Sequence, residues 1–310
     1  MKVSSLSGRY ALLCPSVLLG LFLHGNALAG PITFDTALPV ASREGVLRGQ
    51  YVLVRATGDP TPLGRSITVQ AAPAALAYGV TPRLALFGIV PYFDKSLKMN
   101  TPSGRIERSA SGIGDLLFLG RYTAYALDRS GSTIRLAPFA GVKLPTGRDD
   151  VSDGLGRLPR PLQPGSGSWD GLGGVVFTWQ TLAWEFDADA GYRKNTAADG
   201  FRFGDQAFTD ASFQYRVWPR RLGAGVPAYV FAVAESNLFL QGRDRVGGVP
   251  DPDSGGTRWI VGLGLQYVTE RLVIEGIYQV PAVQQLNGNA VETDHSLSVG
   301  VRWKFSFLSS

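Results

Sequence analysis

The chain has 310 residues, of which 39 are glycine, and a formal net charge of +5 at pH 7. A charge this small and this dispersed argues against a nucleic-acid partner, and no apolar run beyond residue 29 has the length of a transmembrane helix. No segment sustains the 3.6-residue period of a helix, and clusters of Gly, Pro, Asp and Ser divide the chain at short intervals, which is typical of an all-β protein.

The N-terminus has the pattern of a secretory signal peptide. Two basic residues, Lys2 and Arg9, precede a mostly apolar stretch, 11–23, the segment contains no acidic residue, and residues 27–29 (Ala-Leu-Ala) form a small-x-small cleavage motif. We expect cleavage after Ala29, which lowers the net charge from +5 to +3 and removes Cys14, the one cysteine of the chain. The mature protein would then contain no disulfide and no reactive thiol.

Alternation of apolar and polar residues with a period of two predicts twelve strands after an irregular periplasmic leader at residues 30–44. The connections after odd-numbered strands are long and polar, as in 94–111 and 145–168, whereas those after even-numbered strands are short. The predicted strands are residues 45–56, 66–78, 84–93, 112–125, 134–144, 169–178, 182–193, 207–218, 226–239, 257–268, 272–280 and 297–305.

This organisation favours a single transmembrane, antiparallel, up-and-down β-barrel of about 12 strands over residues 45–310. Strands of roughly ten residues are long enough to cross the hydrocarbon core when tilted. Short turns at the periplasmic end and long loops outside explain the alternating connections, which a soluble β-sandwich, the competing fold, does not require. We therefore expect the protein in the outer membrane of a Gram-negative cell, with membrane lipid and the barrel-insertion machinery as its partners.

The last predicted strand supports this interpretation. Its apolar row runs from Leu297 to Phe305 and its polar row includes Ser298 and Arg302. A polar residue, a glycine and two aromatic residues near the end of the chain resemble the C-terminal insertion signal of outer-membrane barrels, although here 306–310 follow it.

The polar rows of a barrel face its lumen, and here they carry charges of both signs. Two interpretations stay open: the charges pair with one another, or they line a path for a solute. A strongly ion-selective pore would show one sign. In the ninth strand we expect Tyr229, Phe231 and Val233 to face outward. The candidate lumen-lining residues are Arg48, Asp115, Arg121, Arg135, Lys143, Glu185, Asp187, Asp189, Arg216, Arg258, Glu275 and Arg302.

Closure of the barrel pairs the last strand with the first. This pairing brings Arg302 and Lys304 close to Arg48 at the periplasmic mouth. Glu275 or a bound anion must then lie near these three bases.

Catalysis finds little support. The mature chain has one histidine, His295, so we predict no multi-histidine metal site and no cofactor. An outer-membrane phospholipase would need a serine beside this histidine, but Ser296 points to the opposite face of the same strand. Ser111 and Ser298 lack a supporting motif. We therefore predict no catalytic residues and a non-enzymatic role.

Three segments carry a resemblance to a known family. They are Thr-Ala-Leu-Pro-Val at 36–40, Gly-Ile-Gly-Asp-Leu-Leu-Phe-Leu-Gly-Arg-Tyr at 112–122 and Gly-Val-Lys-Leu-Pro-Thr-Gly at 141–147. Together they resemble the exported proteins of the meta-pathway of phenol degradation family. The resemblance implies an outer-membrane transporter for small hydrophobic or aromatic compounds, and Asp115 and Lys143 match its polar motif positions. The alternative is a non-transporting structural or surface-binding barrel.

Overall fold

A computed structural model describes residues 30–221 and 227–306. The predicted signal peptide, its cleavage site and Cys14 lie outside the described residues. Within them, no helix has the length and apolar character needed to cross a membrane.

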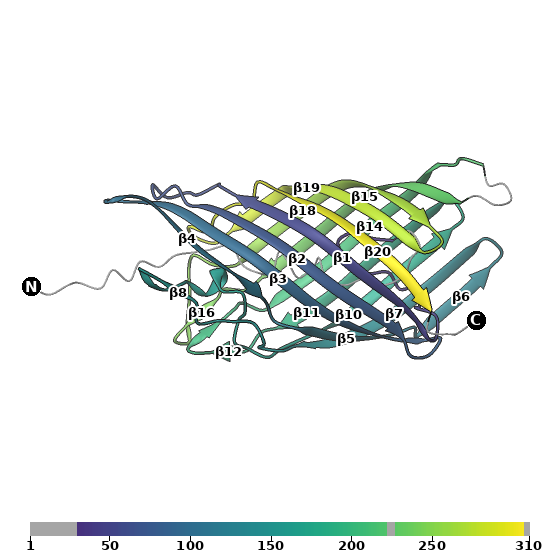
Figure 1. Ribbon diagram of the computed structural model, residues 1–310, viewed down its shortest axis with the longest axis horizontal. Helices are drawn as coiled ribbons and strands as arrows, with labels where there is room; N and C mark the ends of the chain where they lie inside the picture. The colour runs from purple at the N-terminus through teal and green to yellow at the C-terminus, as the bar shows by residue number, and fades with distance from the viewer. Residues whose placement is uncertain (1–29, 222–226, 307–310) are drawn as a thin grey trace, which may run out of the picture.

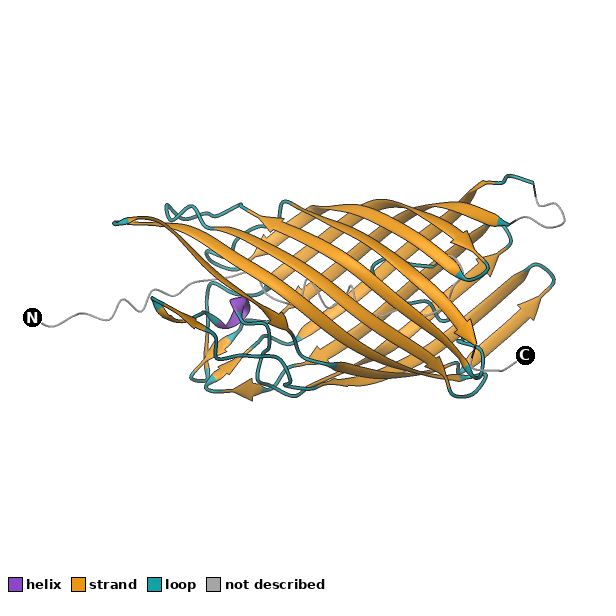
Figure 2. Ribbon diagram, viewed as in Figure 1, coloured by secondary structure: helices purple, strands orange, loops and turns teal. Residues whose placement is uncertain are grey.

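The described chain forms a closed, antiparallel barrel of twelve strands (Figures 1 and 2). Closure is complete because the last strand pairs with the first over twelve residue pairs and every other wall strand pairs with its two neighbours. A closed sheet has no unpaired edge, which is what a lipid environment demands. The wall consists of β1 (Glu44–Ala56), β2 (Ser66–Gly79), β3 (Leu84–Thr101), β4 (Gly104–Ile113) continued by β5 (Leu117–Tyr122), β7 (Ser132–Lys143), β10 (Asp170–Thr181), β11 (Trp184–Lys194), β14 (Gln206–Trp218), β15 (Ala228–Gln241), β18 (Gly256–Thr269), β19 (Leu272–Leu286) and β20 (His295–Ser306).

The predicted barrel of about twelve strands is confirmed, and the loop lengths alternate as predicted except after the third strand, where residues 102–103 form a tight turn in place of a long loop. The end of β20 lies beside the start of β1 and the short turns, while the long loops gather at the opposite end (Figure 1). β6 (Tyr125–Arg129) pairs with the first part of β7, and this hairpin reaches beyond the barrel at the end with the short turns (Figure 2). The long loops hold β8 (Ser152–Asp153), β9 (Gly156–Arg157), the 3-10 helix η2 (Arg160–Leu162), β12 (Ala197–Ala198), β13 (Phe201–Arg202), β16 (Arg245–Val246) and β17 (Val249–Pro250).

Two boundaries differ from the sequence prediction. Residues 94–111, predicted as a long polar loop, form the end of β3 and most of β4. The reason is that Lys95, Leu97 and Met99 continue the inward row of β3, where they are buried.

Residues 112–125, predicted as one strand, are interrupted between β4 and β5. At this break the backbone N–H of Gly114 donates to the carbonyl of Pro91 at 2.8 Å. The side chain of Asp115 is thereby turned toward the base of the loop at 144–169, which it holds through hydrogen bonds described below.

The two faces of the wall follow the predicted alternation in most strands. Leu263 on the outer wall is 74% exposed, whereas Gln266 on the inner wall is fully buried. Strand nine is the exception: Val233, predicted to face outward, is buried against Ile32 and Ile277. The outward prediction for Tyr229, Phe231 and Val233 is wrong, because this row faces the lumen and Val233 packs on Ile32 of the leader.

The leader itself is irregular, as predicted, but it lies inside the barrel. Ile32 and Phe34 are fully buried, and Ala37 and Val40 join the main apolar cluster. Nothing in the alternation pattern of residues 30–44 predicted this position.

Candidate functional site

The inner wall has an apolar side and a polar side. The apolar side is formed by β2, β3, β5 and β7, which place small and aromatic side chains inward. The polar side is formed by β11, β14, β15, β18, β19, β20 and β1. The buried side chains of the apolar side are Ala71, Ala75, Ala77, Ala85, Phe87, Ile89, Phe93, Leu117, Leu119, Ala137 and Phe139.

The leader is bound to the polar side through its backbone. The carbonyl of Ile32 accepts hydrogen bonds from Arg48 at 2.6 Å and Gln50 at 3.2 Å, and its N–H donates to Glu235 at 2.5 Å. Arg302 donates to the carbonyl of Pro31. Buried backbone groups need such partners, so these inward side chains determine the path of the leader.

A second set of contacts holds the next part of the leader. Arg121 forms a buried ion pair with Asp35 and donates to the carbonyls of Thr36 and Leu38. The hydroxyl of Thr36 lies 2.9 Å from that of Thr178 on β10. Arg121 is therefore a leader-binding residue, which the sequence predicted as lumen-lining but without a partner.

The three bases at the periplasmic mouth, Arg48, Arg302 and Lys304, lie beside acidic side chains. Glu275 lies between two of them, with its carboxylate 2.5 Å from Arg48 and 2.7 Å from Arg302. Lys304 pairs with Glu44 at 3.0 Å. All three bases have acidic partners from the protein itself.

Asp115 and Lys143 come together at the base of the longest loop. The Lys143 ammonium lies 2.7 Å from Asp115 and 2.9 Å from Asp170, and it also donates to Ser166. Asp115 accepts hydrogen bonds from the backbone N–H groups of Gly147 at 3.0 Å and of Ser166 at 2.9 Å. This cluster ties both ends of the loop to the wall.

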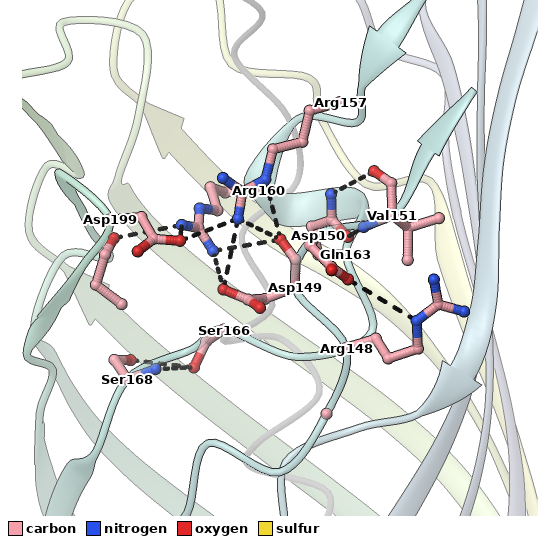
Figure 3. A network of polar contacts seen from close by, with 12 residues as sticks. Arg148, Asp149, Asp150, Val151, Arg157, Arg160, Gln163, Ser166, Ser168 and Asp199 are labelled. Atoms are coloured by element: carbon pink, nitrogen blue, oxygen red, sulfur yellow. Dashed lines mark hydrogen bonds and ion pairs between the residues drawn. The ribbon is translucent and has the colours of Figure 1, made fainter. Parts of the chain in front are cut away.

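The same loop is tied to its neighbours by ion pairs (Figure 3). Arg160 lies 2.6 Å from Asp149 and 2.8 Å from Asp199, which belongs to the loop between β11 and β14. Arg157 also reaches Asp199, at 3.0 Å. Hydrogen bonds from Arg157 and then Arg160 lower the pKa of Asp199. On the inner side, Lys95 donates to the carbonyl of Gln163 at 2.7 Å.

A cavity of about 70 Å³ lies beneath this loop. Its floor and walls come from the apolar side of the lumen, with Ile89, Phe93 and Leu117 among them, and from Pro164 and Phe203 of the loops. Charged groups also border it. These are Lys95, Asp115, Lys143, Arg160 and Arg193.

The remaining candidates are dispersed. Arg135 pairs with Asp128 at 2.6 Å on the β6–β7 hairpin. Arg216 donates to the carbonyl of Leu182 at 2.6 Å. Arg258 is buried on the inner face of β18.

Glu185, Asp187 and Asp189 form the inward acidic row of β11. The partners of these acids on β14 are Gln214, Ser212 and Asp210. Arg216 of the same strand is not among them.

Sequence reasoning missed Glu235, Asp170 and Asp35 as lumen residues. Glu235 was missed because it shares a face with Val233, and the face of that strand was assigned incorrectly. Asp170 begins β10 and bonds Arg193 at 3.1 Å. Asp35 carried no signal, because the leader has no period from which a direction can be inferred.

The histidine has the position that the alternation predicts. His295 stacks on the outward Tyr278, with ring centroids 5.6 Å apart. Ser296 and Ser298 are buried on the inner face, so neither adjoins the imidazole. Over residues 30–221 and 227–306, no group of three or more His, Cys, Asp or Glu side chains is arranged to hold a metal ion.

The chain matches one protein family and is similar in structure to solved outer-membrane barrels. A model of the family described as "Putative MetA-pathway of phenol degradation" matches residues 74–280. The COG4313 outer membrane channel from Pseudomonas putida F1 has a similar structure, with a TM-score of 0.60 and 15% identity over 87% of this chain and 97% of that chain. At this identity the likeness concerns the fold. No curated protein matches the sequence.

Two other barrels are more distantly similar. The beta domain of the Bordetella autotransporter BrkA has a TM-score of 0.47 and 11% identity over 84% of this chain and 99% of that chain. The translocator domain of the autotransporter NalP from Neisseria meningitidis has a TM-score of 0.43 and 13% identity over 86% of this chain and 91% of that chain.

Proposed function

Because the chain belongs to the family of the MetA pathway of phenol degradation, we propose that it is an outer-membrane channel for small hydrophobic or aromatic compounds. In this proposal it is exported with cleavage after Ala29, inserted by the barrel-insertion machinery, and acts without catalysis. The name of its structural neighbour, an outer membrane channel, supports the same class.

The observation that carries the proposal is the apolar side of the inner wall. A water-filled pore for hydrophilic solutes is lined by polar groups, whereas β2, β3, β5 and β7 place mostly apolar side chains inside this barrel. That surface leads to the cavity bordered by Ile89, Phe93 and Leu117. Ligand sites for apolar molecules are concave and mostly apolar, with few polar groups.

The proposal is tested by transport with the purified, refolded mature protein in liposomes. Entry of a small aromatic probe should exceed entry of a sugar of similar size. Ile89→Asn places an amide in the cavity wall and should slow the aromatic probe. Ile260→Asn makes the same change on the inner face of β18, outside the cavity, and serves as the matched control. Equal effects of the two variants would contradict a path along the apolar side.

A second candidate is a barrel that binds a partner at its loops without transport. It is favoured by the filled lumen, in which Arg48, Arg121 and Arg302 hold the leader. A folded protein that passes neither the aromatic probe nor ions would support this candidate and exclude the channel.

A further inference from the structure

The acidic row of β11 and the facing row of β14 contain buried oxygens that lack donors. Both carboxylate oxygens of Asp189, one of Asp187 and one of Asp210 have no hydrogen-bond partner among the described residues. All three side chains are at least 96% buried, with exposures of 4%, 0% and 2%. Asp189 and Asp210 are direct partners across the strand pair, a position in which Cβ atoms lie about 5 Å apart.

An uncharged side chain, that of Gln214, also has a buried oxygen without a donor. Gln214 is fully buried on the inward row of β14. Its amide nitrogen donates to the hydroxyl of Ser212 at 2.7 Å, which turns the amide head toward the stretch of wall between Asp187 and Asp210. The amide oxygen has no donor within the described part of the chain.

No cationic side chain neutralises this group. None of the ion pairs found in residues 30–221 and 227–306 involves Asp187, Asp189 or Asp210. Two inward arginines of the lumen bind other groups: Arg121 binds Asp35 and the leader carbonyls, and Arg302 binds Glu275.

Buried carboxylates without a counter-charge are strongly unfavourable, and directly opposed like charges add to the penalty. This part of the wall carries negative charge alone.

We propose that Asp189 and Asp210 hold a hydrated divalent cation of the Mg²⁺ or Ca²⁺ class on the polar side of the lumen. Two carboxylates match the charge of such an ion, and hard cations prefer oxygen ligands. The ion keeps part of its water shell, as Mg²⁺ does when one or two carboxylates bind it. The uncharged oxygen of Gln214 and the free oxygen of Asp187 accept hydrogen bonds from the bound waters.

The test measures cation binding to the full mature protein in detergent. Isothermal titration of the metal-free barrel with Ca²⁺, and separately with Mg²⁺, should show one site per chain. Asp189→Asn and Asp210→Asn, each close in size to the original residue, should weaken binding by roughly tenfold or more, because affinity for hard cations follows the number of charged ligands. Asp94→Asn removes an exposed aspartate from the outer face of β3 and should leave binding unchanged.

Folding of every variant is checked by the difference in electrophoretic mobility before and after boiling. Thermal unfolding gives an independent readout: Ca²⁺ should raise the Tm of the wild type and of Asp94→Asn, but not that of the double variant Asp189→Asn, Asp210→Asn. A folded wild-type barrel that binds neither ion would overturn the proposal and would indicate that the two carboxyl groups share a proton instead. Binding that survives in the folded double variant would overturn it as well.

Discussion

Arg48 and Arg302 lie directly opposite each other across the seam where β1 and β20 close the barrel. Like charges at such positions repel, but the carboxylate of Glu275 contacts both guanidinium groups, at 2.5 and 2.7 Å. The two arginines also donate to adjacent carbonyls of the leader, those of Ile32 and Pro31. The pair therefore joins barrel closure and leader binding in one polar cluster.

Glu275→Gln should destabilise the barrel. The substitution leaves two buried guanidinium groups without their carboxylate, a change that typically costs about 3–5 kcal/mol. Urea unfolding in detergent or lipid measures the loss. Glu44→Gln is the control, since the Glu44–Lys304 pair is partly exposed and such pairs contribute at most about 1 kcal/mol. If the two variants lose similar amounts of stability, the cluster of Arg48, Glu275 and Arg302 contributes no more than a partly exposed ion pair.

The strands were predictable because lipid and lumen impose opposite chemistry on alternate residues. Leu297, Val299 and Val301 face outward and Ser298 faces inward, as their order requires. Closure of the barrel also predicted Glu275 or a bound anion beside the bases of the mouth, and Glu275 lies there.

The leader and strand nine were not predictable in this way. The backbone of the leader is held by Arg121, Glu235 and Arg302, which lie about 85 to 271 residues away in sequence. No local period encodes such contacts. Val233 packs on Ile32 of the leader. Because the sequence did not place the leader inside the barrel, the apolar row of strand nine was assigned to the outer face.

Locking the leader in place should suppress transport. The hydroxyls of Thr36 and Thr178 lie 2.9 Å apart, so thiols at the two positions would lie near each other, and an oxidant joins them where the Cβ atoms can approach to about 4 Å. The mature chain would contain no other cysteine. In the double variant, conductance and entry of the aromatic probe should be low under oxidising conditions and should recover on reduction. The single variants Thr36→Cys and Thr178→Cys should not respond to reductant. Transport that is unaffected by the crosslink would show that the leader does not move during passage.

The loop between β15 and β18 should become less stable as the pH rises from about 4 to about 6. Burial raises the pKa of Asp244 to about 6, while an aspartate in an unfolded chain titrates near 3.9. Because the folded pKa is the higher one, the loop is most stable below pH 4 and loses that stability as the carboxyl ionises. Asp244→Asn should remove this dependence and stabilise the loop at pH 7 by at most about 2–3 kcal/mol. Hydrogen exchange of residues 242–255 at pH values from 4 to 7, corrected for intrinsic rates, measures the effect. An equal slope in wild type and variant would exclude Asp244 as the titrating group.

A charge on the outer wall should report how deeply each position lies in the membrane. Leu263 is the most exposed large apolar side chain of β18, at 74%, and Tyr267 lies on the same face four residues closer to the short turn at Thr269. Leu263→Arg should destabilise the barrel in lipid by roughly 2–4 kcal/mol if this position is near the bilayer midplane, whereas an arginine near the interface costs about 0–1 kcal/mol. The same substitution at Tyr267 should therefore cost less, apart from the lost aromatic contacts, which Tyr267→Ala measures separately. Urea unfolding in liposomes gives all three values. If both arginines are tolerated equally well after that correction, β18 does not cross the hydrocarbon core at this depth.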